Sequence, residues 1–294
     1  MWYLRYTRHW HVVWLALCLL FPVQSIAMLT VIYPQSESTS DPRFEDVQTL
    51  LRTALNATTP EFGPYELLPS NQPMNEARYL RELKIGKTVN VVWSSTSVQK
   101  ERDFLPIRIP LRKSLMGYRI ALINQDKQDD LNRIQTVEDL ASLTIGQGMG
   151  WGDVDLYNAN GLKVLTTRYD SLFAMVNIGR VDIFPRGINE IFKEQETFGP
   201  QFSKLAIEKH LVIYYPWPYY FFVNRNNPEL AKRLETGLRQ MILDGTFEQI
   251  FQRYHKQSME RANIRQRRII RLTNPFLPPD TPLQDKTLWN DPER

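Results

Sequence analysis

The sequence has very little of the residue chemistry that metal sites and nucleophilic catalysis need. Cys18 is the only cysteine among 294 residues, and there are four histidines, of which His210 and His255 alone lie beyond residue 27. The zinc pattern H-E-x-x-H and the nucleophile pattern G-x-S-x-G are both absent. We therefore expect no disulfide in the mature chain, no metal, no cofactor and no catalytic residue set.

A long hydrophobic run is also missing. Beyond the N-terminus no segment approaches the ~20 apolar residues of a transmembrane helix. The first 27 residues resemble a secretory signal, because Arg5 and Arg8 precede a mostly apolar run over 12–23 and small residues follow at 25 and 27. We expect residues 1–27 to be a cleaved signal peptide and the mature protein to be soluble and periplasmic.

A charge excess of one sign is absent as well. The formal net charge is +4, and it falls to +2 without the two arginines of the signal. A chain so close to neutrality is not expected to bind nucleic acid. The 267 residues after the signal suffice for two lobes without disulfides, and we expect a monomer whose partner is a small molecule.

Strands and helices alternate along the mature chain. Compact apolar runs at 28–33, 65–68 and 89–93 predict strands, and helical periodicity at 41–56 and 75–83 predicts the helices between them. A second strand–helix series begins at Tyr118. This alternation predicts parallel sheets, and extended segments near 111–118 and 210–216 would join two lobes.

The fold class that follows is α/β, with two lobes, each a mainly parallel sheet flanked by helices, and two hinge crossings. We assign 28–117 and 212–268 to lobe 1 and 118–211 to lobe 2. The proline-rich tail 269–294 keeps apolar residues such as Phe276 and Trp289, so we expect it to pack on the body.

Four glycines follow a short apolar strand in the stretch 143–155, which reads LTIGQGMGWGDVD. Such a junction can turn backbone N–H groups toward an anion. The dinucleotide pattern G-x-G-x-x-G fails because Trp151 occupies the place of the third glycine. Two interpretations stay open: Gly148 and Trp151 line a ligand site, or the stretch is a structural turn in which Asp153 caps the next helix.

Other candidates stand at predicted strand ends, where α/β sheets bind their ligands. Arg186 could clamp a carboxylate or phosphate, or form a surface salt bridge. Arg119, near the first crossing, could bind ligand or lock the hinge. The end of the third strand could offer a stacking ring and hydroxyls, or be a polar loop with a packed tryptophan; its residues are Trp93, Ser94, Ser95 and Thr96.

Three longer stretches resemble the bacterial periplasmic solute-binding proteins of the type 2 architecture, and in particular family 3, which serves amino-acid uptake. They are 139–151, 169–186 and 221–254, and the last is the most specific, with its strand, Asn-Pro-Glu-Leu, amphipathic helix and Asp-Gly-Thr. The resemblance covers roughly 28–254. Within the family, the sequence looks most like an uncharacterised branch.

The resemblance implies a ligand carboxylate held by an arginine after the third strand and a ligand ammonium held by an acid after the G-x-x-D strand. Arg102 is the nearest match to that arginine. Gly187 occupies the place of the acid, so Glu190 one helical step further could substitute.

Function follows as an expectation from this resemblance. We expect a solute-binding protein that captures a small polar or anionic solute, amino-acid-like or an organic acid, in an interlobe cleft for an ABC transport permease or a membrane sensor. The alternatives are a sensory module that reports its ligand to a membrane partner, and a dehydratase-like enzyme on the same fold with Glu101 or Glu190 as acid or base.

Overall fold

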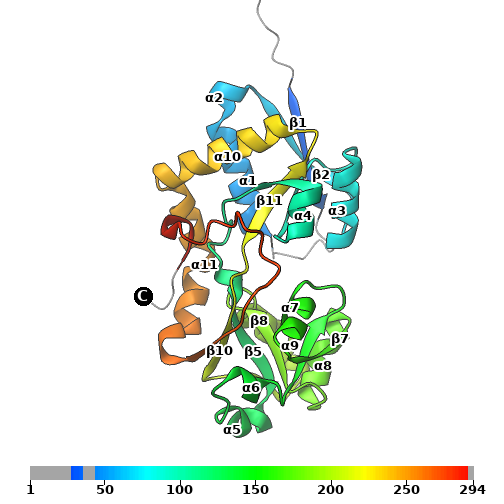
Figure 1. Cartoon of the computed structure of the whole chain (residues 1–294), viewed down its shortest axis with the longest axis vertical. Helices are drawn as coiled ribbons and strands as arrows, with labels where there is room; N and C mark the ends of the chain where they lie inside the picture. The colour runs from blue at the N-terminus through cyan, green and yellow to red at the C-terminus, as the bar shows by residue number, and fades with distance from the viewer. Residues whose placement is uncertain (1–27, 36–43, 291–294) are drawn as a thin grey trace, which may run out of the picture.

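The computed structural model describes residues 28–35 and 44–290, so the predicted signal peptide and the predicted helix start at Asp41 and Pro42 lie outside the described residues. The elements separate into two lobes along the long axis (Figure 1). Among the described residues no helix is long and apolar enough to cross a membrane.

Lobe 1 contains the first strands of the chain and one late strand. β1 (Leu29–Gln35) pairs in parallel with β2 (Tyr65–Pro73), whereas β11 (Tyr219–Asn224) runs antiparallel between β3 (Val91–Ser95) and β4 (Phe104–Ile107). The Asn90 side chain joins β1 to the start of β3, because it accepts from Ile32 N and donates to the Thr30 carbonyl. The helices of this lobe are α1 (Glu45–Ala57), α2 (Thr59–Phe62), α3 (Glu76–Ile85), α4 (Val98–Asp103) and α10 (Pro228–Leu243).

Helices α1 and α10 pack at close range. Gly237 makes this possible, because a Cβ there would collide with the main chain of Ala54. The apolar faces predicted from helical periodicity are buried, including Val47, Leu51 and Leu238. Helix α10 begins at the predicted Asn-Pro signal, where the Asn227 side chain accepts from Leu230 N.

Lobe 2 is built on one large sheet with the strand order β12-β10-β5-β8-β6-β7, and β9 also pairs with β5. Strand β5 is antiparallel to β8, β9 and β10, whereas β6–β7, β6–β8 and β10–β12 are parallel pairs. Apolar clusters cover both faces of this sheet. The strands are β5 (Tyr118–Asn124), β6 (Thr144–Gly148), β7 (Lys163–Thr167), β8 (Ile183–Gly187), β9 (Leu205–Ile207), β10 (Leu211–Tyr214) and β12 (Arg268–Arg271), and the helices are α5 (Gln128–Leu131), α6 (Val137–Leu140), α7 (Asp153–Ala159), α8 (Tyr169–Asn177) and α9 (Ile191–Phe198).

Two boundaries differ from the sequence-based assignment. Strand β10 pairs with β5, so residues 212–214 belong to the lobe 2 sheet and not to lobe 1. The C-terminal segment also begins inside lobe 2, because β12 pairs with β10. Both strands are only four residues long, and such a short strand does not reveal from its own sequence which sheet it joins.

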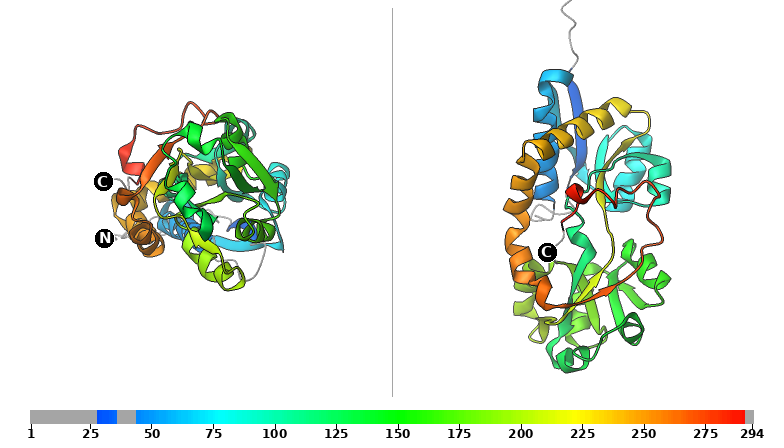
Figure 2. Two further views of the ribbon diagram at one scale, coloured as in Figure 1. Left: turned by 90° about the horizontal axis from the view of Figure 1, so that it is seen from below. Right: turned by 60° about the vertical axis from the view of Figure 1, so that its left-hand side comes forward.

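The lobes are connected by more of the chain than two crossings. The crossings predicted near 111–118 and 210–216 lie at 108–117 and 215–218 in the structure. Helix α11 (Thr246–Ala262) is one continuous helix. Its Phe247 lies in the lobe 1 core, and its Phe251 and Ala262 lie in a lobe 2 core. The segment after β12 returns to lobe 1, where Leu288 is buried in the core, so it forms a fourth connection (Figures 1 and 2).

Candidate functional site

The lobe 1 part of the candidate site is the carboxyl end of β3. Side chains alternate along this strand, and the Trp93 ring is 2% exposed in the lobe 1 core, 6.0 Å from the ring of Tyr33 and 5.6 Å from that of Phe44. The structure therefore places Trp93 as a core residue and not as a stacking platform for a ligand. Ser94, Ser95 and Thr96 are buried polar residues at the end of the strand.

Lys100 holds this strand end together, although it was not among the residues predicted from the sequence. Its ammonium donates to the hydroxyl of Ser94 (2.6 Å), the carbonyl of Ser95 (3.0 Å) and Glu76 Oε1 (2.7 Å). Lys100 lies in α4, directly after β3. A lysine three residues after an N-cap serine was the available signal, although that pattern is common.

A second set of polar contacts starts at Thr96. Its hydroxyl donates to Glu101 Oε1 (2.7 Å), and Glu101 accepts two bonds from Arg108 at 3.0 and 2.6 Å. Arg102 does not join this set. The side chain of this arginine, which was expected to bind a carboxylate, is exposed on α4, and its carbonyl accepts from Arg225.

In lobe 2 the glycine stretch packs around Trp151. A Cβ at Gly148 would collide with the Trp151 ring, so this glycine makes room for the indole. The ring lies 6.2 Å from the ring of Phe184 and 4.7 Å from the guanidinium of Arg186. Asp153 does not cap α7, because Gly152 is the N-cap residue and no side chain caps this helix.

Arg119 and Asp153 instead form a buried pair beneath α7. Arg119 Nη2 lies 2.9 Å from Asp153 Oδ2, and that carboxylate also accepts from the Tyr215 hydroxyl at 2.7 Å. Tyr157 completes the group with a hydroxyl 3.2 Å from that of Tyr215. Burial raises the pKa of the Tyr157 hydroxyl, and the nearby Asp153 raises it further, so the phenol stays protonated.

Arg186 is equally occupied. Its Nε and Nη2 donate to the two oxygens of Glu194, each at 2.7 Å, and Nη2 lies 3.2 Å from Glu190 Oε2. The Tyr169 hydroxyl also donates to Glu194 (2.8 Å). The guanidinium predicted to clamp a solute is thus neutralised by carboxylates of its own lobe.

Glu190 lies where three arginines converge. Its Oε2 accepts from Gly187 N (3.1 Å) and is 3.6 Å from Arg119 Nη1. Burial by itself raises the pKa of Glu190, but Arg186, Arg119 and Arg112 together outweigh burial and hold that pKa below its ordinary value. Glu190 is therefore an ionised carboxylate, with 14% of its side chain exposed.

Arg112, from the first crossing, has its own partner in lobe 1. It forms a bidentate pair with Asp46 at 2.6 and 2.8 Å, and His255 Nε2 lies 3.1 Å from the same carboxylate. These charged residues form one cluster of three guanidinium groups and four carboxylates, which are Arg112, Arg119, Arg186, Asp46, Asp153, Glu190 and Glu194. The cluster thus holds one more carboxylate than guanidinium.

The two halves of the site approach each other at Gly152. A Cβ there would lie 3.2 Å from the Trp217 ring and 3.9 Å from the Ser95 hydroxyl. Gly152 begins α7 in lobe 2, Trp217 belongs to the second crossing and Ser95 ends β3 in lobe 1. The structure thus brings Ser95 and Thr96 into one region with Gly148, Trp151, Arg119, Arg186 and Glu190, and leaves Trp93 and Arg102 outside it.

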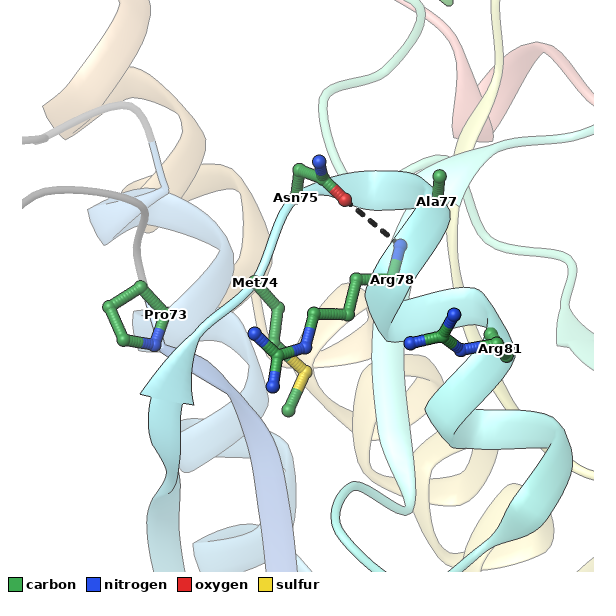
Figure 3. Close-up of a pocket in the computed structure, with 6 residues that line it drawn as sticks. All are labelled: Pro73, Met74, Asn75, Ala77, Arg78 and Arg81. Atoms are coloured by element: carbon green, nitrogen blue, oxygen red, sulfur yellow. Dashed lines mark hydrogen bonds between the residues drawn. The ribbon is translucent and has the colours of Figure 1, made fainter.

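A separate cavity of about 450 Å³ opens on lobe 1 at the start of α3, lined by Pro73, Met74, Asn75, Ala77, Arg78 and Arg81 (Figure 3). Arg78 donates to Gln72 (2.9 Å), and Asn75 caps the helix by accepting from Arg78 N. No residue predicted from the sequence lines this cavity. Among the described residues no group of histidine, cysteine and carboxylate side chains could hold a metal ion.

Comparison with known proteins identifies the fold. No protein-family model matches the chain, and no curated protein does. Solved structures do match, each over 77% of this chain. An ancestral arginine-binding protein bound to arginine matches over 97% of its length at 18% identity with a TM-score of 0.54, and a structure from glutathione import through GshT and the cystine importer TcyBC of Streptococcus mutans matches over 95% at 14% with 0.55. The ancestral amino acid-binding protein AncCDT-1, a precursor of cyclohexadienyl dehydratase, matches over 95% at 18% with 0.51.

The chain therefore has the two-lobed fold of amino-acid-binding and other substrate-binding proteins, as predicted from its sequence. At these identities the likeness establishes the fold and leaves the ligand to the residues of the site.

Proposed function

We propose that this protein is an exported solute-binding protein that captures a small polar solute, amino-acid-like or an organic acid, between its lobes and delivers it to a membrane permease or sensor. The approach of Gly152 to Ser95 and Trp217 carries the proposal. A glycine at this point lets the end of β3 and the start of α7 close on each other, and the region between two such lobes is the usual place for a small ligand.

Buried polar groups without partners support a site on this side of lobe 2. Within the described part of the chain, both amide atoms of Gln147 and the Nε of Arg119 lack hydrogen-bond partners. Leaving a buried polar group unpaired costs about 1–3 kcal/mol. A polar solute or its hydration water would supply the missing bonds.

The charge of the solute depends on Glu190. A solute carboxylate that binds Arg119 Nη1 and Arg186 Nη2 must replace Glu190, which already lies against both atoms. A solute ammonium would instead bind Glu190 directly. Glu190→Gln separates these cases, because it should strengthen the binding of a displacing carboxylate and weaken the binding of an ammonium.

The enzyme alternative receives less support from the same residues. A general acid near neutral pH needs a raised pKa, whereas arginines lower the pKa of Glu190. Glu101 is held by Arg108 and Thr96. These contacts favour a binding role.

Thermal unfolding with panels of amino acids, organic acids and sugars tests the proposal. A ligand at 100 times its dissociation constant stabilises a protein by ~2.7 kcal/mol. Gly152→Val should abolish the shift, because its side chain would lie against the Trp217 ring and fill the space next to the Ser95 hydroxyl. If no compound raises the melting temperature, or if Gly152→Val leaves the shift intact, the proposed site is wrong.

A further inference from the structure

The segment from Arg268 to Asn290 begins as part of lobe 2. Strand β12 pairs with β10 in register from Leu211 opposite Arg268 to Tyr214 opposite Arg271, and Leu272 N donates to the Tyr214 carbonyl at 2.8 Å. The segment then passes beside the crossings and reaches lobe 1 (Figures 1 and 2).

Two anchors on different lobes lie close together in this segment. Thr273 N donates to Asn160 Oδ1 (3.0 Å) and the Thr273 carbonyl accepts from Asn160 Nδ2 (2.8 Å), at the end of α7 in lobe 2. The Phe276 carbonyl accepts from Val98 N (3.3 Å), the first residue of α4 in lobe 1. Between them, Asn274 donates to the Pro216 carbonyl of the second crossing at 2.9 Å.

The chain between these two anchors is too short to allow the two lobes to move far apart at this point. A fully extended chain spans at most ~3.6 Å per residue, so the stretch from Thr273 to Phe276 reaches no more than ~11 Å. The distance between Asn160 and Val98 can therefore not exceed this reach plus the lengths of the two anchoring hydrogen bonds. A lobe movement that separates the two residues further must break an anchor.

The lobe 1 anchor is the weaker one. Its polar contacts are the bond at Phe276 and the pair between Arg108 and Asp280, which are 3.3 Å apart with 74% of the Asp280 side chain exposed. Pro278 and Thr281 of the same stretch are buried. Exposed ion pairs contribute about 0–1 kcal/mol. The lobe 2 anchor adds the whole β12 ladder to its amide bonds, so the lobe 1 contacts should break first.

Release at Phe276 and Asp280 would not detach the segment. Leu288 is buried in the lobe 1 core with Trp289 packed against it, and Asn290 N donates to the Lys113 carbonyl (2.9 Å). From Thr273 to Leu288 an extended chain reaches ~54 Å. Breaking the Phe276 and Asp280 contacts would therefore lengthen the connection between the lobes without detaching it.

We propose that residues 268–290 are a strap that limits the separation of the lobes and releases at the Phe276–Asp280 latch when they open. If the proposed function holds, the strap would set how readily the proposed site between the lobes exchanges its contents with solvent. The geometry that supports it does not depend on the identity of any solute, and its test needs none.

Lengthening the strap is the sharpest test. About eight Gly and Ser residues inserted between Asn274 and Pro275 add ~28 Å of reach and keep every anchor. The matched control places the same insertion between Leu283 and Gln284, beyond both anchors. Interlobe distances are measured by pulsed electron paramagnetic resonance between two spin labels. The labels are attached at Arg81→Cys in lobe 1 and Ile178→Cys in lobe 2, two positions that are each 71% exposed. The full chain also carries Cys18→Ser, so that no other thiol remains.

We expect the insertion after Asn274 to broaden the distance distribution and shift it to longer values, and the control to match the parent. Asp280→Asn should give a smaller change in the same direction, and Asp285→Asn, whose partner Thr287 lies in the strap itself, should give none. An unchanged distribution for the insertion after Asn274, or an equal change in both insertions, would overturn the proposal.

Discussion

Replacement of Arg186 by alanine should unfold lobe 2 far more easily, because this guanidinium is a structural partner before it is a ligand contact. Its side chain is 4% exposed and lies between Glu194 and Glu190. The substitution leaves two carboxylates, 9% and 14% exposed, without their main counter-charge. It also removes the cation above the Trp151 ring.

The magnitude follows from the burial of the pair. Removing one partner of a buried ion pair costs about 3–5 kcal/mol, because the remaining charge is uncompensated. A total stability of about 5–15 kcal/mol is typical of a domain, so the loss is a large fraction. Protonation relieves the orphaned carboxylates, so the penalty should shrink between pH 7 and pH 5.

Urea unfolding followed by tryptophan fluorescence measures this loss. Arg180→Ala is the matched control, because Arg180 is an exposed arginine of the same lobe, and it should cost less than about 0.5 kcal/mol. The double variant Arg186→Ala/Glu194→Gln should recover part of the loss. If Arg186→Ala costs no more than Arg180→Ala, the pairs with Glu194 and Glu190 do not form and Arg186 is free to bind a solute.

Two further predictions concern lobe 1. Burial alone raises the pKa of Asp46, but Arg112 and His255 outweigh burial and hold that pKa well below its ordinary value. The contribution of Asp46 to stability is therefore present above the unfolded pKa of ~3.9 and is lost as the pH falls below that value. Asp46→Asn should lower the free energy of unfolding at pH 7 and weaken its decrease with falling pH in the acid range. An unchanged decrease in the acid range would show that Asp46 does not cause it. Gly237→Ala should lower the free energy of unfolding by about 1–3 kcal/mol or more, because its methyl group would force α10 away from the Ala54 main chain. The control Gly199→Ala meets only the flexible Gln195 side chain and should cost clearly less in thermal unfolding. Equal losses for the two variants would contradict this account.

Part of the candidate site could be predicted from the sequence, and part could not. The strand ends at Ser94–Thr96 and the glycine stretch were identified, because strand ends and glycine turns have local signals. The occupancy of Arg119 and Arg186 was not, since their partners Asp153 and Glu194 are chosen by the packing of α7 and α9 on the sheet. The prediction that Arg102 binds a solute carboxylate lacks support for a related reason, because Arg102 lies on α4 with its side chain exposed to solvent.

The sequence by itself determined the local structure and the two-lobed plan. Helix starts and stops carry local signals, such as Asn227 before Pro228 and Gly245 at φ +83°, and compact apolar runs specify buried strands. Only the tertiary structure decided that β10 and β12 join the lobe 2 sheet, that α11 runs unbroken between the lobes, and that the tail straps them together. Periodicity specifies which face of an element is buried, but the partner it is buried against depends on contacts between residues far apart in the chain.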